Sequence, residues 1–404
     1  MAPFRLRLAQ FSAVVLASGM FISSLFQGTN NFWTDISREH NTQTVVKTKQ
    51  TLCKEIVDSH DNHARLVRTL SLTQAHDPFD DIFPLPSPSL EPLPRCEGQQ
   101  IDRREILDVF LFGGGEVDTL EIRLFELTDV VDKFIAVVSN VTHKGEPSYD
   151  VLKPLLAEKG RLARFSDKVE VFELHQKLNE SAGIFQLEAE KGLAIARNLT
   201  SRYNDSTLVI FGHVDEIPAR EDVWRAAHCD VKLPGNFGIW FPYGNIKFAF
   251  RSDFPARNRP WTLGDPGVTL AGQLEKMQLP RGRFSSVLGR GFHATNYCFP
   301  PQVILKKMTA TEYGGFDSAT LEKLKNGSDT MEDCSRVMHE IRDSCLQAPQ
   351  KLGARYRSIS ELIKSGVDEN DFYLPFALRQ APDRYPCWDP KGAAFDPRAV
   401  LINS

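Results

Sequence analysis

Two carboxylates stand directly after an apolar run in the middle of the chain. Residues 207–220 read TLVIFGHVDEIPAR, so Asp215 and Glu216 follow the run and Pro218 stops it. A β-branched run of this kind predicts a central strand of an α/β sheet, and ligands of open sheets bind outside the carboxyl ends of such strands. Adjacent carboxylates there suit a divalent cation bound to a phosphate, because hard cations prefer oxygen ligands. A solvated turn after a core strand is the alternative interpretation.

A second acidic segment lies upstream and begins with a predicted strand over residues 107–112. Three glycines follow this strand, and Glu116 and Asp118 then open a helical pattern. Residues 133–139 predict the next strand, which completes a β-α-β unit. The glycines carry neither the GxGxxG nor the GK[ST] spacing of phosphate-binding loops, so they predict a turn.

The helix of this unit has leucines at helical spacing, which predicts one apolar face. Asp118 is suited to cap its first turn. Glu121, Arg123 and Glu126 fall between the leucines, so we expect them on the more polar faces of the helix.

Three blocks of the sequence resemble glycosyltransferase family 17, whose animal members add the bisecting GlcNAc to N-glycans. They are EVDTLEIRLFEL with the following DVVDKFIAVVSNVTHKGEP, the VDEIPAR segment, and GFHATNYCFPPQVILKKMTATEYGGF at residues 291–316. The chain departs from the family pattern at three positions. His213 stands where an Asp is usual, Phe292 replaces a Trp, and Ala294 replaces a Cys.

The resemblance implies an α/β fold of the Rossmann-like nucleotide-sugar transferase class, the GT-A type. It implies β-1,4-mannosyl-glycoprotein 4-β-N-acetylglucosaminyltransferase activity: inverting transfer of GlcNAc from a UDP-GlcNAc donor to the 4-hydroxyl of the β-linked core mannose of glycoprotein N-glycans. A catalytically silent, membrane-anchored glycan-binding homologue is the alternative, favoured by the three departures. A transferase with a different donor or acceptor is a further alternative.

The same resemblance implies a divalent metal, with Mn²⁺ as the expected ion. Asp215 and His293 are the predicted ligands, because carboxylate oxygen and neutral imidazole both suit this ion. A buried structural histidine is the alternative for His293. For His213 there are three alternatives. It ligates the metal, it hydrogen-bonds uridine, or its presence indicates a metal-independent variant. We expect Asp215, His293 and the bend near Glu116 to surround one nucleotide-sugar pocket.

Roles for the remaining candidates follow from the resemblance and from the needs of the reaction. The departing diphosphate needs positive charge, and the acceptor hydroxyl needs a base. The candidate catalytic bases are Glu216 and Glu116. The candidate substrate-binding residues are Asp118, Arg123, His213 and Lys307. Arg123 is alternatively a residue that organises the turn, and Lys307 is alternatively an ordinary surface lysine.

The amino-terminal region predicts a membrane protein. Residues 8–27 carry no charge and follow two arginines, which favours a signal-anchor helix with a cytoplasmic tail over residues 1–7. A cleaved signal peptide is the alternative. Residues 28–100 become Pro-rich and predict a luminal stem, which leaves residues 101–404 for the catalytic domain. The expected location is the Golgi membrane, single-pass type II, with the catalytic domain in the lumen.

Composition excludes electrostatic capture of nucleic acid. Lys and Arg number 48 against 52 for Asp and Glu, a formal charge of -4, and no long basic block occurs. The seven cysteines show no zinc-site spacing, and an oxidising lumen permits disulfides whose pairing the sequence leaves open. Sequons for N-glycosylation begin at Asn140, Asn179, Asn198, Asn204 and Asn326.

Two further elements are predicted between these blocks. Residues 184–199 predict a helix that precedes the strand at 208. Residues 237–241 and 245–250 predict the two arms of a hairpin around Pro242-Tyr243-Gly244. The aromatic residues of this hairpin suit either core packing or stacking against sugars.

Overall fold

The structure is a computed structural model, and it describes residues 93–141, 148, 151–175, 184–243, 245–250, 266–277, 284–294, 356–381 and 384–385. The predicted tail and anchor, the stem up to residue 92, and Lys307 lie outside these ranges. Among the helices that the structure describes, none is both long and apolar enough to cross a membrane.

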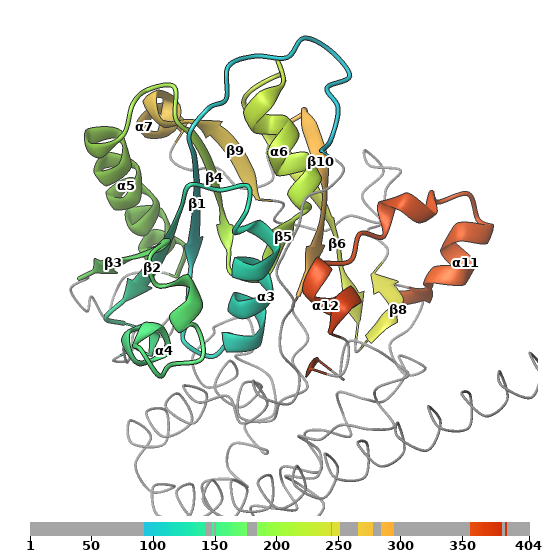
Figure 1. The fold of residues 1–404 in the computed structure, drawn as a ribbon, viewed down its shortest axis with the longest axis horizontal. Coiled ribbons are helices and arrows are strands. Elements are labelled where there is room, and N and C mark those ends of the chain that lie inside the picture. The colour runs from blue at the N-terminus through green and yellow to red at the C-terminus, as the bar shows by residue number, and fades with distance from the viewer. Residues whose placement is uncertain are drawn as a thin grey trace, which may run out of the picture.

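One mixed sheet of eight strands forms the centre of the molecule (Figure 1), in the order β3-β2-β1-β4-β9-β6-β10-β5. Its first half is parallel and contains β3 (Val169–Leu174), β2 (Lys133–Ser139), β1 (Ile106–Leu111) and β4 (Leu208–His213). Its second half contains β9 (Gly267–Leu270), β6 (Gly235–Trp240), β10 (Val287–His293) and β5 (Glu216–Pro218). Strand β9 runs antiparallel to both β4 and β6, β6 and β10 are parallel, and β5 pairs antiparallel with β10.

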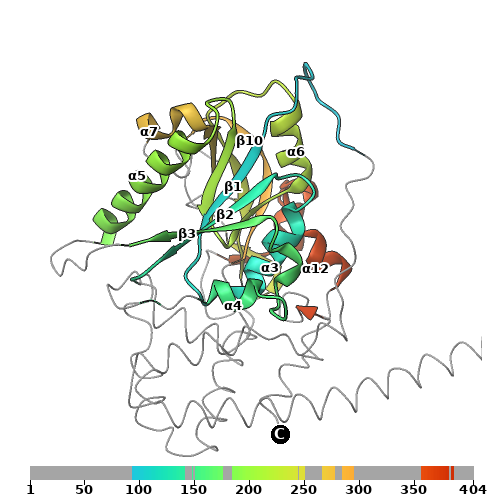
Figure 2. The ribbon, with the colours of Figure 1, turned by 60° about the vertical axis from the view of Figure 1, so that its left-hand side comes forward.

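Helices cover both faces of the sheet, as Figures 1 and 2 show. One face packs against α3 (Val117–Leu127), α4 (Leu152–Leu156), α6 (Arg220–His228) and α12 (Phe376–Gln380). The other packs against α5 (Ile184–Arg202) and α7 (Leu274–Met277). Alternate residues of β1 and β4 divide between the two apolar clusters, as the two-residue period of a strand requires. The mixed α/β architecture fits a glycosyltransferase domain.

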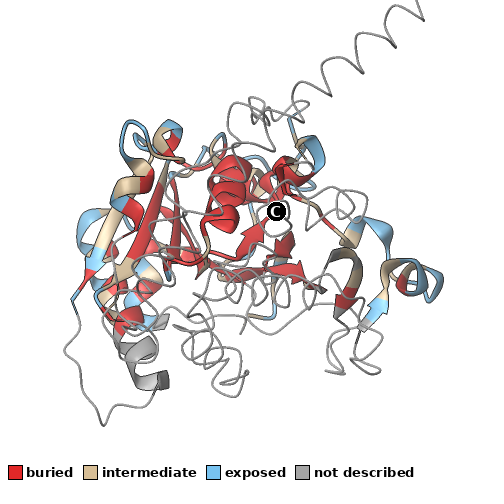
Figure 3. Cartoon of the chain, turned by 90° about the horizontal axis from the view of Figure 1, so that it is seen from below, coloured by how far each residue is buried: buried red, intermediate tan, exposed pale blue. Residues whose placement is uncertain are grey.

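Helix α3 is buried on all sides, which corrects the expectation of polar faces for Glu121, Arg123 and Glu126 (Figure 3). The helix is covered on its outer side by the carboxy-terminal segment, where α12 packs against it. The N-cap residue of α3 is Glu116, so Asp118 is the second helical residue and does not cap the helix as predicted. The strong helical period identified the helix but not the segment that covers it.

A small sheet stands beside the large one and contains β7 (Pro242–Tyr243), β8 (Asn245–Phe250) and β11 (Tyr356–Ser358). The predicted hairpin is therefore made by β7 and β8, and residues 237–241 are not its first arm. Residues 237–240 belong to β6, which is fully buried and pairs with β10 in the main sheet. Helix α11 (Ile359–Lys364) follows β11 and begins with a capping box between Ser358 and Glu361. The described residues also form the short 3-10 turns η1 (Ala163–Phe165), η2 (Ala271–Gln273) and η6 (Glu369–Asp371).

Candidate active site

The two residues after β4 turn the chain from the middle of the sheet to its edge. Three strands separate β4 from β5 in the sheet order, which in a flat sheet places them about 19 Å apart. Only Val214 and Asp215 connect His213 to Glu216, and three Cα steps span at most about 11 Å. The sheet must therefore curl at the carboxyl end of β4. We call residues 213–216 the Asp215 turn.

The curl brings Asp215 and His293 together, although they are far apart in the sequence. Glu216 is the register partner of His293 in the β5–β10 pair. The N–H of Ala294 then donates to the carbonyl of Asp215 over 2.7 Å. Both side chains are largely buried, with 4% of Asp215 and 8% of His293 exposed. A carboxylate and an imidazole thus flank one backbone hydrogen bond at the carboxyl end of β4.

Arg123 reaches the Asp215 turn from helix α3, behind the sheet edge. Its Nη1 donates to the carbonyls of His213 over 2.8 Å and of Glu216 over 2.6 Å. Its Nε and Nη2 bind the two oxygens of Asp108 on β1, over 2.8 and 2.6 Å. Both side chains of this ion pair have 0% exposure. Arg123 therefore binds other protein groups, and its bonds to the two carbonyls hold the turn.

Glu216 is also bound to the backbone of the turn. Its Oε2 accepts the N–H of His213 over 2.9 Å, and the residue has 0% exposure. Gly212 makes this possible, because a Cβ at that position would lie 2.6 Å from the same oxygen. The carboxylate therefore closes the turn by a side-chain to backbone hydrogen bond.

Glu116 lies at the start of α3, in the segment that follows the carboxyl end of β1. Leu111, the last residue of β1, pairs with His213, and its carbonyl accepts the N–H of Val214 over 3.2 Å. The chain then turns through Gly114, which has a φ of 87°, to Glu116 at the start of α3. A positive φ of this size favours glycine. Glu116 is half-buried. It therefore remains partly accessible, in a segment that follows a strand whose end adjoins the Asp215 turn.

Asp118 has a different environment from the one predicted for a substrate contact. Its Oδ1 forms an ion pair of 2.6 Å with Nη2 of Arg161, which also binds Glu121 over 2.7 Å. Asp118 is buried, like Arg161. The first turn of α3 is thereby linked to the segment before η1.

Aromatic rings pack against His293 and Phe292. The imidazole stacks on the ring of Phe241 with 4.7 Å between centroids. Phe292 packs edge to face against Trp240, and both are fully buried. Ala294 is buried as well. Aromatic packing is therefore the role of Trp240, whereas the sequence left sugar stacking open.

The residues that the structure describes contain no group of three or more His, Cys, Asp and Glu side chains able to hold a metal ion. Asp215 and His293 carry donor atoms of a suitable chemistry, and the β5–β10 pairing brings their backbones together. Divalent ions at phosphate sites are often held by one or two protein ligands together with phosphate oxygens. A metal bound here would therefore need oxygen ligands from a bound phosphate in addition to these two residues.

The outer side of α3 carries a carboxylate held by two arginines. Nη2 of Arg384 binds Glu121 over 2.6 Å, and the Tyr385 hydroxyl donates to it over 2.6 Å. Burial acts to raise the pKa of Glu121. The charges of Arg161 and Arg384 and their hydrogen bonds outweigh burial and hold this pKa far below its usual range.

A second carboxylate of α3 has the opposite electrostatics. Glu126 accepts hydrogen bonds from the Tyr373 hydroxyl and from the backbone N–H groups of Phe376 and Arg220. Burial raises the pKa of Glu126 to about 7, against these hydrogen bonds and the charge of Arg220. Glu126 therefore joins α3 to the starts of α6 and α12 largely through neutral donors.

Sequence reasoning missed Asp108 and Arg161. Asp108 interrupts an otherwise apolar strand, ILDVFL, and a charge at the centre of such a run is a signal that a buried partner exists. Arg161 stands in a polar segment and gives no comparable signal.

Comparison with known proteins finds a family model that matches part of the chain. Residues 88–237 match the model of Glycosyltransferase family 17. This region includes β1 to β5 with the Asp215 turn, and it ends before β10 and His293. No curated protein matches the chain. The family match and the α/β fold together support glycosyl transfer, with a sugar donor and a glycan acceptor.

Proposed function

We propose that the protein is an inverting, GT-A-type β-1,4-mannosyl-glycoprotein 4-β-N-acetylglucosaminyltransferase that uses UDP-GlcNAc. The observation that carries this proposal is the pairing of the Asp215 turn with the end of β10. It brings the backbones of Asp215 and His293 together at the carboxyl end of a central strand, where ligands of α/β sheets bind. The family match supports the reaction class. The donor and the acceptor follow from the resemblance of the three sequence blocks.

We assign Asp215 and His293 as the residues that hold a divalent cation, with Mn²⁺ as the expected ion. When bound, this ion neutralises the diphosphate of the leaving UDP. His213 is the first residue of the same turn and is assigned to the nucleotide, and Lys307 is assigned to the diphosphate. Two side-chain ligands do not fill the coordination sphere of a divalent ion, so the nucleotide diphosphate is expected to supply further ligands.

The reaction also needs a base for the acceptor hydroxyl. Of the two candidates we favour Glu116, because Glu216 is fully buried and accepts the N–H of His213. The base takes the proton of the mannose 4-hydroxyl while that oxygen attacks the anomeric carbon. The bond from this carbon to the diphosphate oxygen breaks on the opposite side, which inverts the configuration. Arg123 and Asp118 are assigned to the support of the site, because both are buried in ion pairs.

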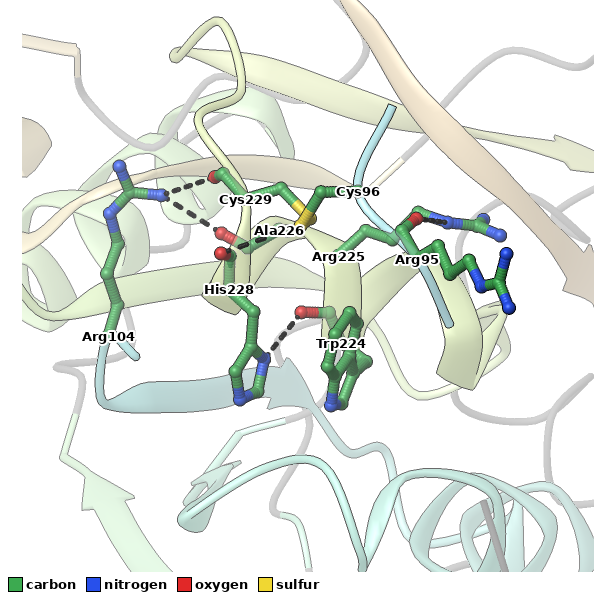
Figure 4. The surroundings of a disulfide bond; sticks show 8 residues. All are labelled: Arg95, Cys96, Arg104, Trp224, Arg225, Ala226, His228 and Cys229. Carbon is green, nitrogen blue, oxygen red and sulfur yellow. Dashed lines mark hydrogen bonds between the residues drawn. A yellow bond between two sulfur atoms is a disulfide. The ribbon is translucent and has the colours of Figure 1, made fainter. Parts of the chain in front are cut away.

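We place the protein in the Golgi membrane with its catalytic domain in the lumen. The disulfide between Cys96 and Cys229 supports an oxidising compartment (Figure 4). It fixes the segment before β1 to the end of α6, where the N–H of Ile101 also donates to the carbonyl of His228 over 2.8 Å. The predicted stem therefore meets the α/β domain at or before Cys96.

The test is transfer by the full-length protein, purified in detergent, with UDP-GlcNAc, Mn²⁺ and a biantennary N-glycan. The product must gain the mass of one N-acetylhexosamine, and linkage analysis must place it on the 4-hydroxyl of the core mannose. Asp215→Asn is expected to lower turnover at least about 100-fold, as expected for loss of an electrostatic contact to the reacting charge. Asp230→Asn is the control, because Asp230 is exposed. Full turnover by Asp215→Asn would remove this residue from the site.

Glycan binding without transfer would favour the silent homologue instead. The specific observation behind this alternative is the set of departures at His213, Phe292 and Ala294. A product with another mass or linkage would keep the enzyme and change its donor or acceptor.

A further inference from the structure

The backbone of the Asp215 turn is held from several directions. The carbonyls of His213 and Glu216 accept from Arg123, and the carbonyl of Asp215 accepts from the N–H of Ala294. The N–H groups of His213 and Val214 are also bound, by the Glu216 carboxylate and by the carbonyl of Leu111. Hydrogen bonds on both sides of Asp215 leave its backbone little freedom to move.

Arg123 contributes the bonds that bracket Asp215, and Asp108 fixes Arg123. A guanidinium is planar, so two bonds to one carboxylate determine the orientation of the whole group. Because Nε and Nη2 are bound to Asp108, the position of Nη1 is fixed as well, and Nη1 donates to the turn. The pair is neutral as a whole and completely buried, so solvent does not screen it.

We infer that Asp108 and Arg123 are positioning residues that set the place of Asp215 for metal and diphosphate binding. This inference rests on the proposed function and assigns a role to two residues that touch neither substrate nor metal. Displacement of a catalytic group by about 1 Å costs on the order of 100-fold in rate. A loosened turn is therefore expected to weaken the site without removing any of its side chains.

Single substitutions of the pair leave one buried charge without its partner, and such variants are expected to fold poorly. The informative variant is the double substitution Asp108→Val with Arg123→Met. It removes both charges and retains apolar bulk, which buried ion pairs often tolerate. Arg123→Lys is the second variant, because lysine keeps the charge and lacks the planar fork.

The first measurement is hydrogen exchange at the amides of residues 213–216 in the full-length protein. The double variant is expected to exchange faster there, with the amides of β1 and β2 unchanged. The second measurement is Mn²⁺ binding by electron paramagnetic resonance, with and without UDP. Affinity is expected to fall about 10- to 100-fold, the usual effect of losing a partner that orients a ligand. Arg123→Lys is expected to lie between the double variant and the wild type.

Arg220→Met is the matched control. Arg220 is also a buried arginine, but it binds Asp129 and lies over the ring of Phe376. Its loss is expected to leave exchange at the turn and Mn²⁺ affinity unchanged, and equal effects in both variants would reduce Arg123 to a general structural role.

Exchange separates this inference from the proposed function. If the wild type neither binds Mn²⁺ nor transfers GlcNAc, the proposed function fails, while faster exchange at the turn in the double variant still supports the positioning role. A folded double variant with unchanged exchange at residues 213–216 overturns the inference, whatever its activity.

Discussion

Helix α3 makes two polar contacts of opposite kinds, one toward the Asp215 turn and one toward the carboxy-terminal segment. Toward the turn it presents a cation, Arg123, which binds one carboxylate and backbone carbonyls. Toward the carboxy-terminal segment it presents two carboxyl groups, Glu121 and Glu126. The first contact joins α3 to a neighbouring strand and a turn. The second spans up to 264 residues of sequence, between Glu121 and Tyr385.

The difference between these contacts indicates a division of labour within one helix. The contact of Arg123 fixes a backbone that lies beside the proposed reacting groups. The contacts of Glu121 and Glu126 fasten a distant segment over the outer side of the helix. Changes at Arg123 are therefore expected to act on the site, and changes at Glu121 or Glu126 on stability.

The largest effect on stability is expected from Glu121→Gln. The substitution leaves Arg161 and Arg384 buried beside a neutral amide, and breaking a buried ion pair in this way costs about 3–5 kcal/mol. Urea unfolding measures this loss. Glu173→Gln is the control, because the ion pair of Glu173 with Lys153 is exposed and is worth about 1 kcal/mol or less. If Glu121→Gln and the wild type had equal stability, the contact of Glu121 with the carboxy-terminal segment would not stabilise the fold.

The two carboxylates also predict opposite dependences of stability on pH. The pKa of Glu126 is raised from 4.5 to about 7, so between these values the folded protein keeps a proton that the unfolded chain releases. Stability due to Glu126 is therefore complete below about pH 4.5 and is lost as pH rises to about 7, by roughly 3 kcal/mol. For Glu121 the folded pKa is lowered, so its contribution is present above pH 4.5 and is lost in more acidic solution.

Glu126→Gln tests this contrast. The variant is expected to remove the decline between about pH 4.5 and pH 7 and to leave the acid limb of the curve in place. Urea unfolding at several pH values gives both limbs. A wild-type protein whose stability increases throughout this window would contradict the role given to Glu126.

A somewhat smaller effect is expected from the disulfide, which lies away from both contacts of α3. Substitution of Cys96 and Cys229 together by serine removes a cross-link over 133 residues and is expected to cost about 2 kcal/mol or more. Thermal unfolding measures the loss. Hydrogen exchange at residues 213–216 should stay as in the wild type, and faster exchange there would show that the cross-link also supports the turn.

The smallest effect on activity is expected at Asn204, which the proposed luminal location makes a site of N-glycosylation. Asn204 is exposed in the bend before β4, and its carbonyl accepts the N–H of Thr207 over 2.9 Å. It lies at the opposite end of β4 from the Asp215 turn. Asn204→Gln should lose one glycan, seen as a mass shift that matches endoglycosidase treatment, with turnover unchanged.

Asn198→Gln is the matched substitution for this prediction. Asn198 sits on α5, where its Oδ1 accepts from Arg202 over 3.2 Å, and the Thr200 hydroxyl of its sequon donates to the carbonyl of Ala196. We expect Asn204 to be occupied more fully than Asn198. A secreted-pathway protein with an unmodified Asn204 peptide would refute the assignment.

The strands and the long helices of the first half could be predicted from local patterns. The predicted strand at residues 133–139 coincides with β2, the helix from residue 184 with most of α5, and the run ending at His213 with β4. These elements follow from apolar periodicity, which belongs to the element itself. The assignment of residues 237–241 to a hairpin was wrong, because β6 pairs with β9 and with β10, about 30 and 50 residues later.

The candidate site was less accessible to local reasoning. Asp215 stands out as a charge after an apolar run, but its neighbour His293 lies on a different strand, and resemblance alone suggested the pair. The role of Arg123 depends on Asp108 in β1, and a charged residue inside an apolar strand was the available sign of it. The burial of Glu121 depends on Arg384, which no pattern in α3 reveals.

The antiparallel pairing of β5 with β10 has a consequence for how the protein is made. Glu216 meets His293 only after the chain has been extended through residue 293, and pairings of such long sequence separation form slowly. A chain leaving the ribosome is able to complete β1 to β4 well before β10 exists. The proposed catalytic centre is therefore among the last parts of the domain to assemble, and an unfinished polypeptide cannot be active.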